Sequence, residues 1–189
     1  MTDNCIKLAL FDLDGTLFDT EKANYLAYRK ACNDICGVII TEDFFHEQCM
    51  SRNYKEFLPL AGVTADKFHD IHECKKKIYP DFFPSIRKNE SLFSMAELMK
   101  SAGTFLSLVT TASRRNTLDI LEHFGCTDFF DLLVTQEMVT ELKPSPQAYL
   151  YAMEHFSVSP EQCVIFEDSE TGITAARKSG AAVYCVKHF

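Results

Sequence analysis

Residues 8–16, Leu-Ala-Leu-Phe-Asp-Leu-Asp-Gly-Thr, decide which fold we expect for this chain. A short apolar run that ends in turn-forming residues is typical of a buried strand in a parallel sheet. Its carboxyl end carries two acids, Asp12 and Asp14, and in open α/β sheets this end of a strand lines the ligand crevice. Two carboxylates in one small site raise each other's pKa, so such a pair indicates a bound cation or a reaction.

Four further apolar runs have the length of buried strands, and helix-sized segments separate them. Alternation of strands and helices predicts right-handed crossovers and a parallel sheet that is covered by helices on both faces. We therefore predict an α/β fold with a doubly wound, five-stranded parallel sheet. The five predicted strands are residues 6–11, 104–110, 132–135, 163–166 and 182–186.

Capping residues indicate where several helices begin. Ser91 is expected to cap a helix over residues 92–101. Ser145 is expected to cap a helix whose first residue is Pro146, because proline is favoured at that position. The last helix is predicted over residues 171–179.

The first crossover is much longer than the others. About ninety residues separate the first two predicted strands, far more than a simple crossover needs. Helical patterns cover residues 21–36 and 65–79, and Thr41 can cap another helix between them. An insertion beside the acid pair is well placed to act as a lid. The predicted domains are a Rossmann-like core, residues 1–17 and 87–189, and a small helical cap, residues 18–86.

The charge balance argues against polyanionic partners. The 189 residues include 27 acidic and 19 basic ones, which gives a net charge of −8. This balance disfavours nonspecific binding to nucleic acid or to membrane surfaces. We interpret the basic run at residues 75–77 as a solvated helix face. We expect a monomer, although no sequence feature decides the oligomeric state.

The eight cysteines are scattered, and no two of them have CxxC spacing. Thiols in such a pattern typically serve as small core residues in a reducing compartment. The sequence also contains no signal-peptide h-region near its acidic start and no apolar run long enough to span a bilayer. We therefore expect a cytoplasmic protein.

Polar groups follow the other strands as well. Thr110 ends the second predicted strand, and its hydroxyl, with the following amides at Thr111 and beyond, can bind an anionic oxygen. Lys143 is a compact cation just ahead of a predicted helix. Glu167 and Asp168 follow the fourth strand. Because the carboxyl ends of parallel strands meet at one edge of a sheet, we expect these groups to gather around the acid pair.

The order and spacing of these residues resemble the haloacid dehalogenase superfamily. The resemblance covers nearly the whole chain and includes a helical insertion after the first motif. Within the superfamily the chain is similar to the branch with β-phosphoglucomutase-like and phosphoglycolate-phosphatase-like members and a helical cap. The matching motifs are FDLDGT (11–16), LVTTAS (108–113), LKPSP (142–146) and FEDSETGITAARKSG (166–180).

The resemblance implies a role for each acid. Asp12 would be the nucleophile that takes up a phosphoryl group as an aspartyl phosphate. Asp14 would protonate the leaving oxygen and then activate water. Mg²⁺ would be held by Asp12, by Asp14 through its backbone carbonyl, and by Asp168. Glu167 would hold a metal-bound water.

The resemblance also indicates which residues contact the substrate. Lys143 and Thr110 would neutralise and orient the phosphoryl oxygens. Thr16 and Thr111 are further candidates for substrate binding in the same motifs. In the predicted cap, Arg52 lies near the position where related mutases carry a phosphate-binding arginine, but no lysine of the kind those mutases use is evident beside it. A solvated surface arginine is an equally good interpretation of Arg52.

The predicted function is a Mg²⁺-dependent phosphatase that hydrolyses a small phosphorylated metabolite, such as a sugar phosphate. One alternative is a phosphomutase, which would return the phosphoryl group from the same aspartyl phosphate to another hydroxyl of the substrate. The other is a receiver-like phospho-acceptor switch, because receiver domains also accept phosphate on an aspartate beside a metal, a threonine or serine, and a lysine. Asp14 and the inserted helices argue against the switch.

Overall fold

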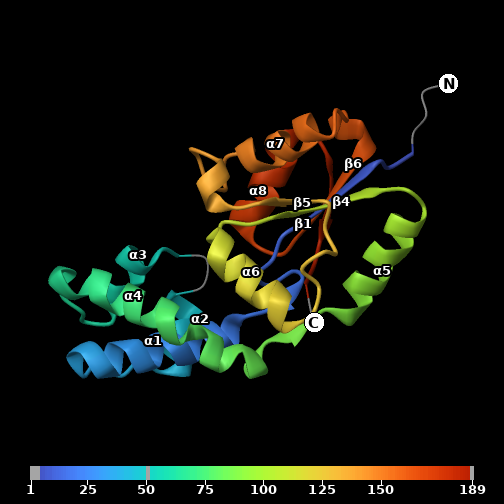
Figure 1. Ribbon diagram of the computed structural model, residues 1–189. Coiled ribbons are helices and arrows are strands. Elements are labelled where there is room, and N and C mark those ends of the chain that lie inside the picture. Colours follow the sequence, from blue (N-terminus) through green and yellow to red (C-terminus); the bar gives the residue numbers. More distant parts are fainter. Residues whose placement is uncertain (1–4, 50–51, 188–189) are drawn as a thin grey trace. The chain divides into compact units, whose positions relative to one another are not determined.

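The computed structural model of the chain describes residues 5–49 and 52–187 (Figure 1). The chain divides into two compact units. The core unit comprises Met1–Asp19 and Arg87–Phe189, and the helical unit comprises Thr20–Ile86. The assignment of these units as a catalytic core and a cap stays a prediction.

The core unit contains a five-stranded sheet whose strands pair in parallel in the order β5-β4-β1-β6-β7. The predicted α/β fold with a doubly wound parallel sheet is therefore confirmed. Strand β1 lies at the centre, and its four residues are fully buried, which explains its unbroken apolar sequence. The strands are β1 Leu8–Phe11, β4 Phe105–Val109, β5 Leu132–Val134, β6 Cys163–Glu167 and β7 Ala182–Cys185.

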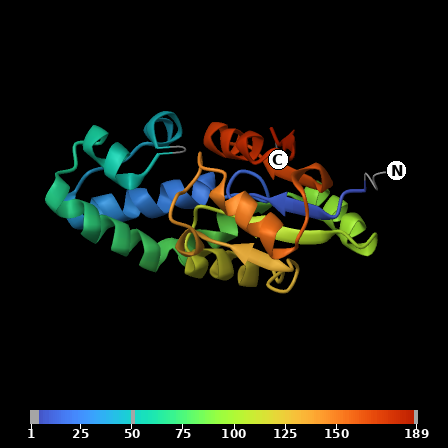
Figure 2. The ribbon, with the colours of Figure 1, turned by 90° about the horizontal axis from the view of Figure 1, so that it is seen from above.

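Helices cover both faces of this sheet. Figure 1 shows α7 and α8 on one side of the sheet and α5 and α6 on the other, and Figure 2 looks onto the side of α7 and α8. Leu8, Leu10 and Ile165 pack against α7 and α8 in one buried cluster. The helices of the core unit are α5 Glu90–Ser101, α6 Arg114–His123, α7 Gln147–His155 and α8 Glu170–Ser179, and short 3₁₀ turns occupy Gln136–Met138 and Pro160–Gln162.

Two predicted caps are wrong. Helix α5 begins two residues earlier than predicted, because the Asn89 side chain accepts a hydrogen bond from the Leu92 amide at 3.1 Å, and Ser91 lies within the helix. Helix α7 begins at Gln147, so Pro146 is its N-cap and not its first residue. Ser145 therefore precedes the N-cap, although its hydroxyl accepts a long hydrogen bond from the Gln147 amide at 3.4 Å while it donates to Glu141 at 2.9 Å.

A small antiparallel sheet joins the two points where the chain leaves and re-enters the core unit. Strand β2, Phe18–Asp19, pairs with β3, Arg87–Lys88. The Arg87 guanidinium also forms an ion pair with Asp19. Sequence patterns miss this sheet, because two-residue strands carry no periodicity. The pairing keeps residues 18 and 19 in the core unit, beyond the boundary predicted after residue 17.

The helical unit confirms the helix predicted over residues 21–36 and the cap predicted at Thr41, whose side chain accepts a hydrogen bond from the Phe44 amide at 3.2 Å. Helix α3 was not predicted, although Asn53 and Glu56 form a capping box at its start. The helices are α1 Glu21–Cys36, α2 Glu42–Gln48, α3 Tyr54–Leu60 and α4 Phe68–Ile78, with 3₁₀ turns at Ala65–Lys67 and Tyr79–Ser85.

The basic run at residues 75–77 is not a uniformly solvated face. Lys75 is buried, and its Nζ lies 3.7 Å from the centroid of the Tyr79 ring. Lys76 and Lys77 are exposed, as predicted. The helical pattern of α4 turns Lys75 inward, and an aromatic face compensates part of its lost hydration.

The cysteines do not all serve as core residues. All eight are free cysteines, and the exposure of their side chains divides them. Cys5 and Cys36 are exposed, which contradicts the core interpretation for these two. The buried cysteines are Cys32, Cys49, Cys126 and Cys163.

Over the described residues, no helix has both the length and the apolar character needed to cross a membrane.

Candidate active site

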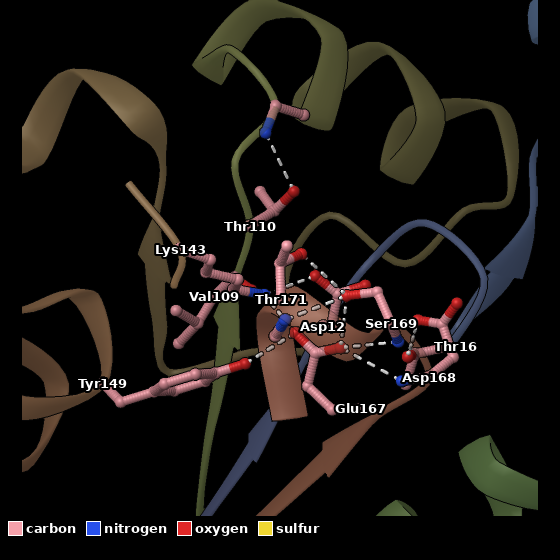
Figure 3. Close-up of polar contacts among 12 residues, drawn as sticks. Asp12, Thr16, Val109, Thr110, Lys143, Tyr149, Glu167, Asp168, Ser169 and Thr171 are labelled. Atoms are coloured by element: carbon pink, nitrogen blue, oxygen red, sulfur yellow. Dashed lines mark hydrogen bonds and ion pairs between the residues drawn. The ribbon is translucent and has the colours of Figure 1, made fainter. Parts of the chain in front are cut away.

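The predicted site residues of the core unit gather at the carboxyl edge of the sheet. The register aligns Phe11 with Leu108 on one side and with Phe166 on the other. The residue that follows Phe11, Asp12, therefore lies between the ends of β4 and β6. Lys143 reaches the same point from the loop before α7 (Figure 3).

Lys143 connects the two innermost carboxylates. Its Nζ lies 2.6 Å from Oδ1 of Asp12 and 2.6 Å from Oε1 of Glu167. It also donates to the backbone carbonyl of Val109 at 3.0 Å. The side chains of Lys143, Asp12 and Glu167 are 5%, 10% and 0% exposed, so water screens these charges very little.

This network contains more negative than positive charge. Burial raises the pKa of Asp12 well above its usual value, with Lys143 opposing the shift and Glu167 adding to it. Burial alone would lower the pKa of Lys143, but attraction to Asp12 and other neighbours raises it well above its usual value. Lys143 therefore stays protonated, and Asp12 needs further positive charge to stay ionised.

Glu167 is saturated with hydrogen-bond donors. Its Oε1 accepts from Lys143 at 2.6 Å and from the Tyr149 hydroxyl at 2.9 Å. Its Oε2 accepts from the Asp168 amide at 3.0 Å, and from both the amide and the hydroxyl of Ser169 at 3.2 Å. A carboxylate has about four lone-pair sites, so these five donors occupy both oxygens.

Two glycines make room for the carboxylates. A Cβ on Gly172 would overlap the carboxylate of Glu167, and one on Gly15 would overlap that of Asp168. Gly15 also has φ +86°, a left-handed conformation that suits glycine. Asp168 is fixed on its other side by Thr16, whose hydroxyl donates to Oδ1 at 2.9 Å. Thr16 is fully buried and holds Asp168 in place, and its predicted contact with the substrate stays a prediction.

Three acids form a cluster that fits a divalent cation. Asp12, Glu167 and Asp168 each offer one oxygen, and these oxygens lie within 4.8 Å of one another. Burial raises the pKa of Asp168 to about 6. Carboxylate oxygens are the ligands that Mg²⁺ takes in proteins, and a bound dication would relieve the excess negative charge. Because the donors to Glu167 occupy both of its oxygens, Asp12 and Asp168 are the better direct ligands.

The remaining predicted residues of the core unit differ in burial and in their contacts. Asp14 is half-buried and is not a member of the acid cluster in the described chain, but its charge helps to raise the pKa of Asp12. The Thr110 side chain is buried, and its hydroxyl accepts a hydrogen bond from the Ala112 amide at 3.0 Å. Thr111, the next residue, is exposed.

Arg52 belongs to the helical unit. Its guanidinium donates to the backbone carbonyl of Gln48 at 3.0 Å and to the Gln48 side chain at 2.9 Å. The residue is exposed. These contacts account for Arg52 within its own helical unit, and its predicted role in phosphate binding stays a prediction.

Sequence patterns missed one residue of the site and one contact at the start of α6. Tyr149 was not singled out from the sequence, yet its hydroxyl bonds to Glu167. Glu137 was not singled out, yet both of its carboxylate oxygens accept from the Arg114 amide, at 3.1 and 3.0 Å, where α6 begins. A tyrosine on a buried helix face is a usable signal, because a buried hydroxyl normally needs a partner.

The match to a family model decides the classification. A model described as haloacid dehalogenase-like hydrolase matches residues 9–186. The chain belongs to this family. The resemblance inferred from the four motifs is thereby confirmed, and the receiver-like alternative is set aside.

Individual members of the haloacid dehalogenase-like hydrolases are similar over almost the whole chain. A phosphorylated carbohydrates phosphatase of Thermotoga maritima is 31% identical over 188 residues, which cover 97% of this chain and 86% of the relative. Two crystal structures of CbbY from Rhodobacter sphaeroides are each 27% identical with a TM-score of 0.84, and the match covers 97% of this chain and 87% of theirs. One holds phosphate, and the other, a variant, holds xylulose-(1,5)bisphosphate. The predicted class, a hydrolase of phosphate monoesters, is confirmed.

Proposed function

We propose that this chain is a Mg²⁺-dependent phosphatase that hydrolyses a small phosphorylated carbohydrate through an aspartyl phosphate on Asp12. The observation that carries the proposal is the position of Asp12. It is a buried carboxylate at the end of the central strand, paired with Lys143 and part of the acid cluster with Glu167 and Asp168. The phosphatase name of the Thermotoga relative and the sugar bisphosphate held by CbbY support the substrate class.

Asp12 and Asp168 would hold the Mg²⁺ ion, and this dication would supply the positive charge that keeps Asp12 ionised and neutralises phosphoryl oxygens. Thr16 and Gly15 keep Asp168 in position for this binding. Lys143 holds Oδ1 of Asp12 and adds a second fixed cation at the phosphoryl group. Such charges cost no reorganisation at the moment of reaction, which makes them effective for phosphoryl transfer.

The chemistry proceeds in two displacements at phosphorus. In the first, a carboxylate oxygen of Asp12 forms a bond to phosphorus while the bond to the substrate oxygen breaks, and Asp14 gives its proton to that oxygen. In the second, Asp14 takes a proton from water, the water oxygen bonds to phosphorus, and the bond to Asp12 breaks. Phosphate leaves and both aspartates return to their starting states. The amides after Thr110, including that of Thr111, are proposed to bind phosphoryl oxygens.

The test is a panel of phosphorylated carbohydrates and p-nitrophenyl phosphate, assayed with Mg²⁺ and with EDTA. The proposal expects phosphate release that needs the metal and that falls at least roughly 10³-fold in Asp12→Asn, because loss of a nucleophile removes the covalent route. The matched control is Asp119→Asn, since Asp119 lies on α6, pairs with Arg115 of the same helix and is not a member of the acid cluster in the described chain. Undiminished turnover by Asp12→Asn overturns the assignment of the nucleophile. Conversion of β-glucose 1-phosphate to glucose 6-phosphate without phosphate release identifies the phosphomutase alternative instead.

A further inference from the structure

A buried tyrosine hydroxyl lies behind the reacting groups. Tyr149 is fully buried on α7, within a cluster of apolar side chains. A phenylalanine fits such surroundings without an oxygen to satisfy, whereas a buried hydroxyl costs free energy unless it forms a hydrogen bond. The hydroxyl of Tyr149 donates to Oε1 of Glu167 at 2.9 Å.

The same oxygen of Glu167 also binds Lys143. Figure 3 shows the tyrosine hydroxyl pointing at Glu167, next to the lysine. From Oε1 of Glu167 the contacts continue to Nζ of Lys143 at 2.6 Å and from there to Oδ1 of Asp12 at 2.6 Å. The Lys143 ammonium also lies 5.1 Å from the centroid of the Tyr149 ring. Tyr149 thus contacts both Lys143 and Glu167, and Lys143 in turn contacts Asp12, the proposed nucleophile.

We propose that Tyr149 is a positioning residue, whose hydroxyl fixes the Glu167 carboxylate so that Glu167 holds the Lys143 ammonium against Asp12. This inference rests on the proposed function, because it concerns the residues that serve the same reaction.

The physical reason is competition for one ammonium group. Lys143 divides its protons among Asp12, Glu167 and a backbone carbonyl. The Tyr149 hydroxyl satisfies part of the acceptor capacity of Glu167 Oε1. Without that hydroxyl, the buried carboxylate has one donor fewer and attracts the ammonium more strongly, away from Asp12. The rate constant kcat should then fall, because the cation is displaced from the reacting oxygen.

The experiment compares Tyr149→Phe with Tyr151→Phe. Tyr151 is an exposed tyrosine on the same helix, so its variant controls for the loss of a hydroxyl from α7. A hydrogen bond to a charged group corresponds to roughly tenfold or more in rate. We expect kcat to fall roughly tenfold or more in Tyr149→Phe, with KM within about twofold of wild type. The Kd for Mn²⁺, a paramagnetic probe used in place of Mg²⁺, should also stay within about twofold. Tyr151→Phe should match wild type throughout.

A second readout does not depend on turnover. In protein with ¹⁵N-labelled lysine, the Lys143 ammonium resonance, assigned with Lys143→Arg, should shift in Tyr149→Phe and stay in place in Tyr151→Phe. The effect on kcat should also shrink to about twofold or less when Tyr149→Phe is added to Glu167→Gln, because Tyr149 acts through that carboxylate.

The outcomes separate the two proposals. Unchanged kcat and an unchanged Lys143 resonance in Tyr149→Phe refute the positioning role and leave the phosphatase in place. The positioning role is also refuted if Tyr149→Phe lowers kcat equally in the wild-type protein and in Glu167→Gln. A rise in the Kd for Mn²⁺ that accounts for the loss of rate refutes it as well. A wild-type enzyme without Asp12-dependent turnover refutes the proposed function, while the resonance still decides whether Tyr149 positions Lys143.

Discussion

Gly172→Ala should lower the stability of the protein, whereas the same change in an ordinary helix raises it. Alanine in place of glycine normally stabilises a helix by about 1 kcal/mol. Here the new methyl group would occupy the space of the Glu167 carboxylate, which must then move. Glu167 accepts five hydrogen bonds at 2.6–3.2 Å, and each bond to a charged group is worth about 1.5–3 kcal/mol. Loss of two of them outweighs the helix gain, so we expect a net destabilisation of about 2–5 kcal/mol.

Urea unfolding and steady-state kinetics measure this prediction. The matched control is Thr171→Ala, because Thr171 is the preceding, exposed residue of α8 and its change should stay within about 0.5 kcal/mol of wild type. Gly172→Ala should also lower kcat by roughly 10²-fold or more, since the displaced carboxylate no longer holds Lys143. A Gly172→Ala protein that is as stable as wild type and fully active would refute the close packing of Glu167 against α8.

Three further predictions concern capping, metal binding and pH. Asn89→Ala should destabilise the protein by about 1 kcal/mol in urea unfolding and Ser91→Ala should not, because Asn89 is the residue that caps α5; equal effects would contradict this. Asp168→Asn should raise the Kd for Mn²⁺, measured by electron paramagnetic resonance, by roughly tenfold or more, and an unchanged Kd would exclude Asp168 as a ligand. Because the folded-state pKa of Asp168, about 6, lies above its unfolded value of about 3.9, the folded protein binds the extra proton between these values. The free energy of unfolding of the metal-free protein should therefore fall as pH rises through this window, and unfolding curves of Asp168→Asn should lack that component.

Local sequence patterns are sufficient where one element alone determines the outcome. The central strand is recognisable because burial on both faces demands an unbroken apolar run, as in Leu8–Phe11. The cap at Thr41 is recognisable because it bonds within its own helix. Asp12, Lys143 and Asp168 could be predicted for a related reason: residues at the ends of parallel strands converge at one edge of the sheet.

The features that were missed depend on contacts between distant segments. The bond between Tyr149 and Glu167 spans 18 residues, and nothing in the helical pattern of α7 indicates it. The pairing of β2 with β3 joins Asp19 to Arg87 across the whole helical unit. Lys75 appeared solvated because charged runs usually are, and only the packing of α4 shows that its side chain turns onto Tyr79.

The stereochemical course at phosphorus tests the central claim most directly. A substrate whose transferred phosphoryl group is chiral through its three oxygen isotopes can be turned over with Mg²⁺ and an alcohol that accepts the phosphoryl group in place of water, and the configuration of the resulting phosphate ester can be read. Each in-line displacement inverts phosphorus, so attack by Asp12 followed by attack at the aspartyl phosphate predicts overall retention. Overall inversion would mean a single displacement and would contradict a covalent intermediate on Asp12.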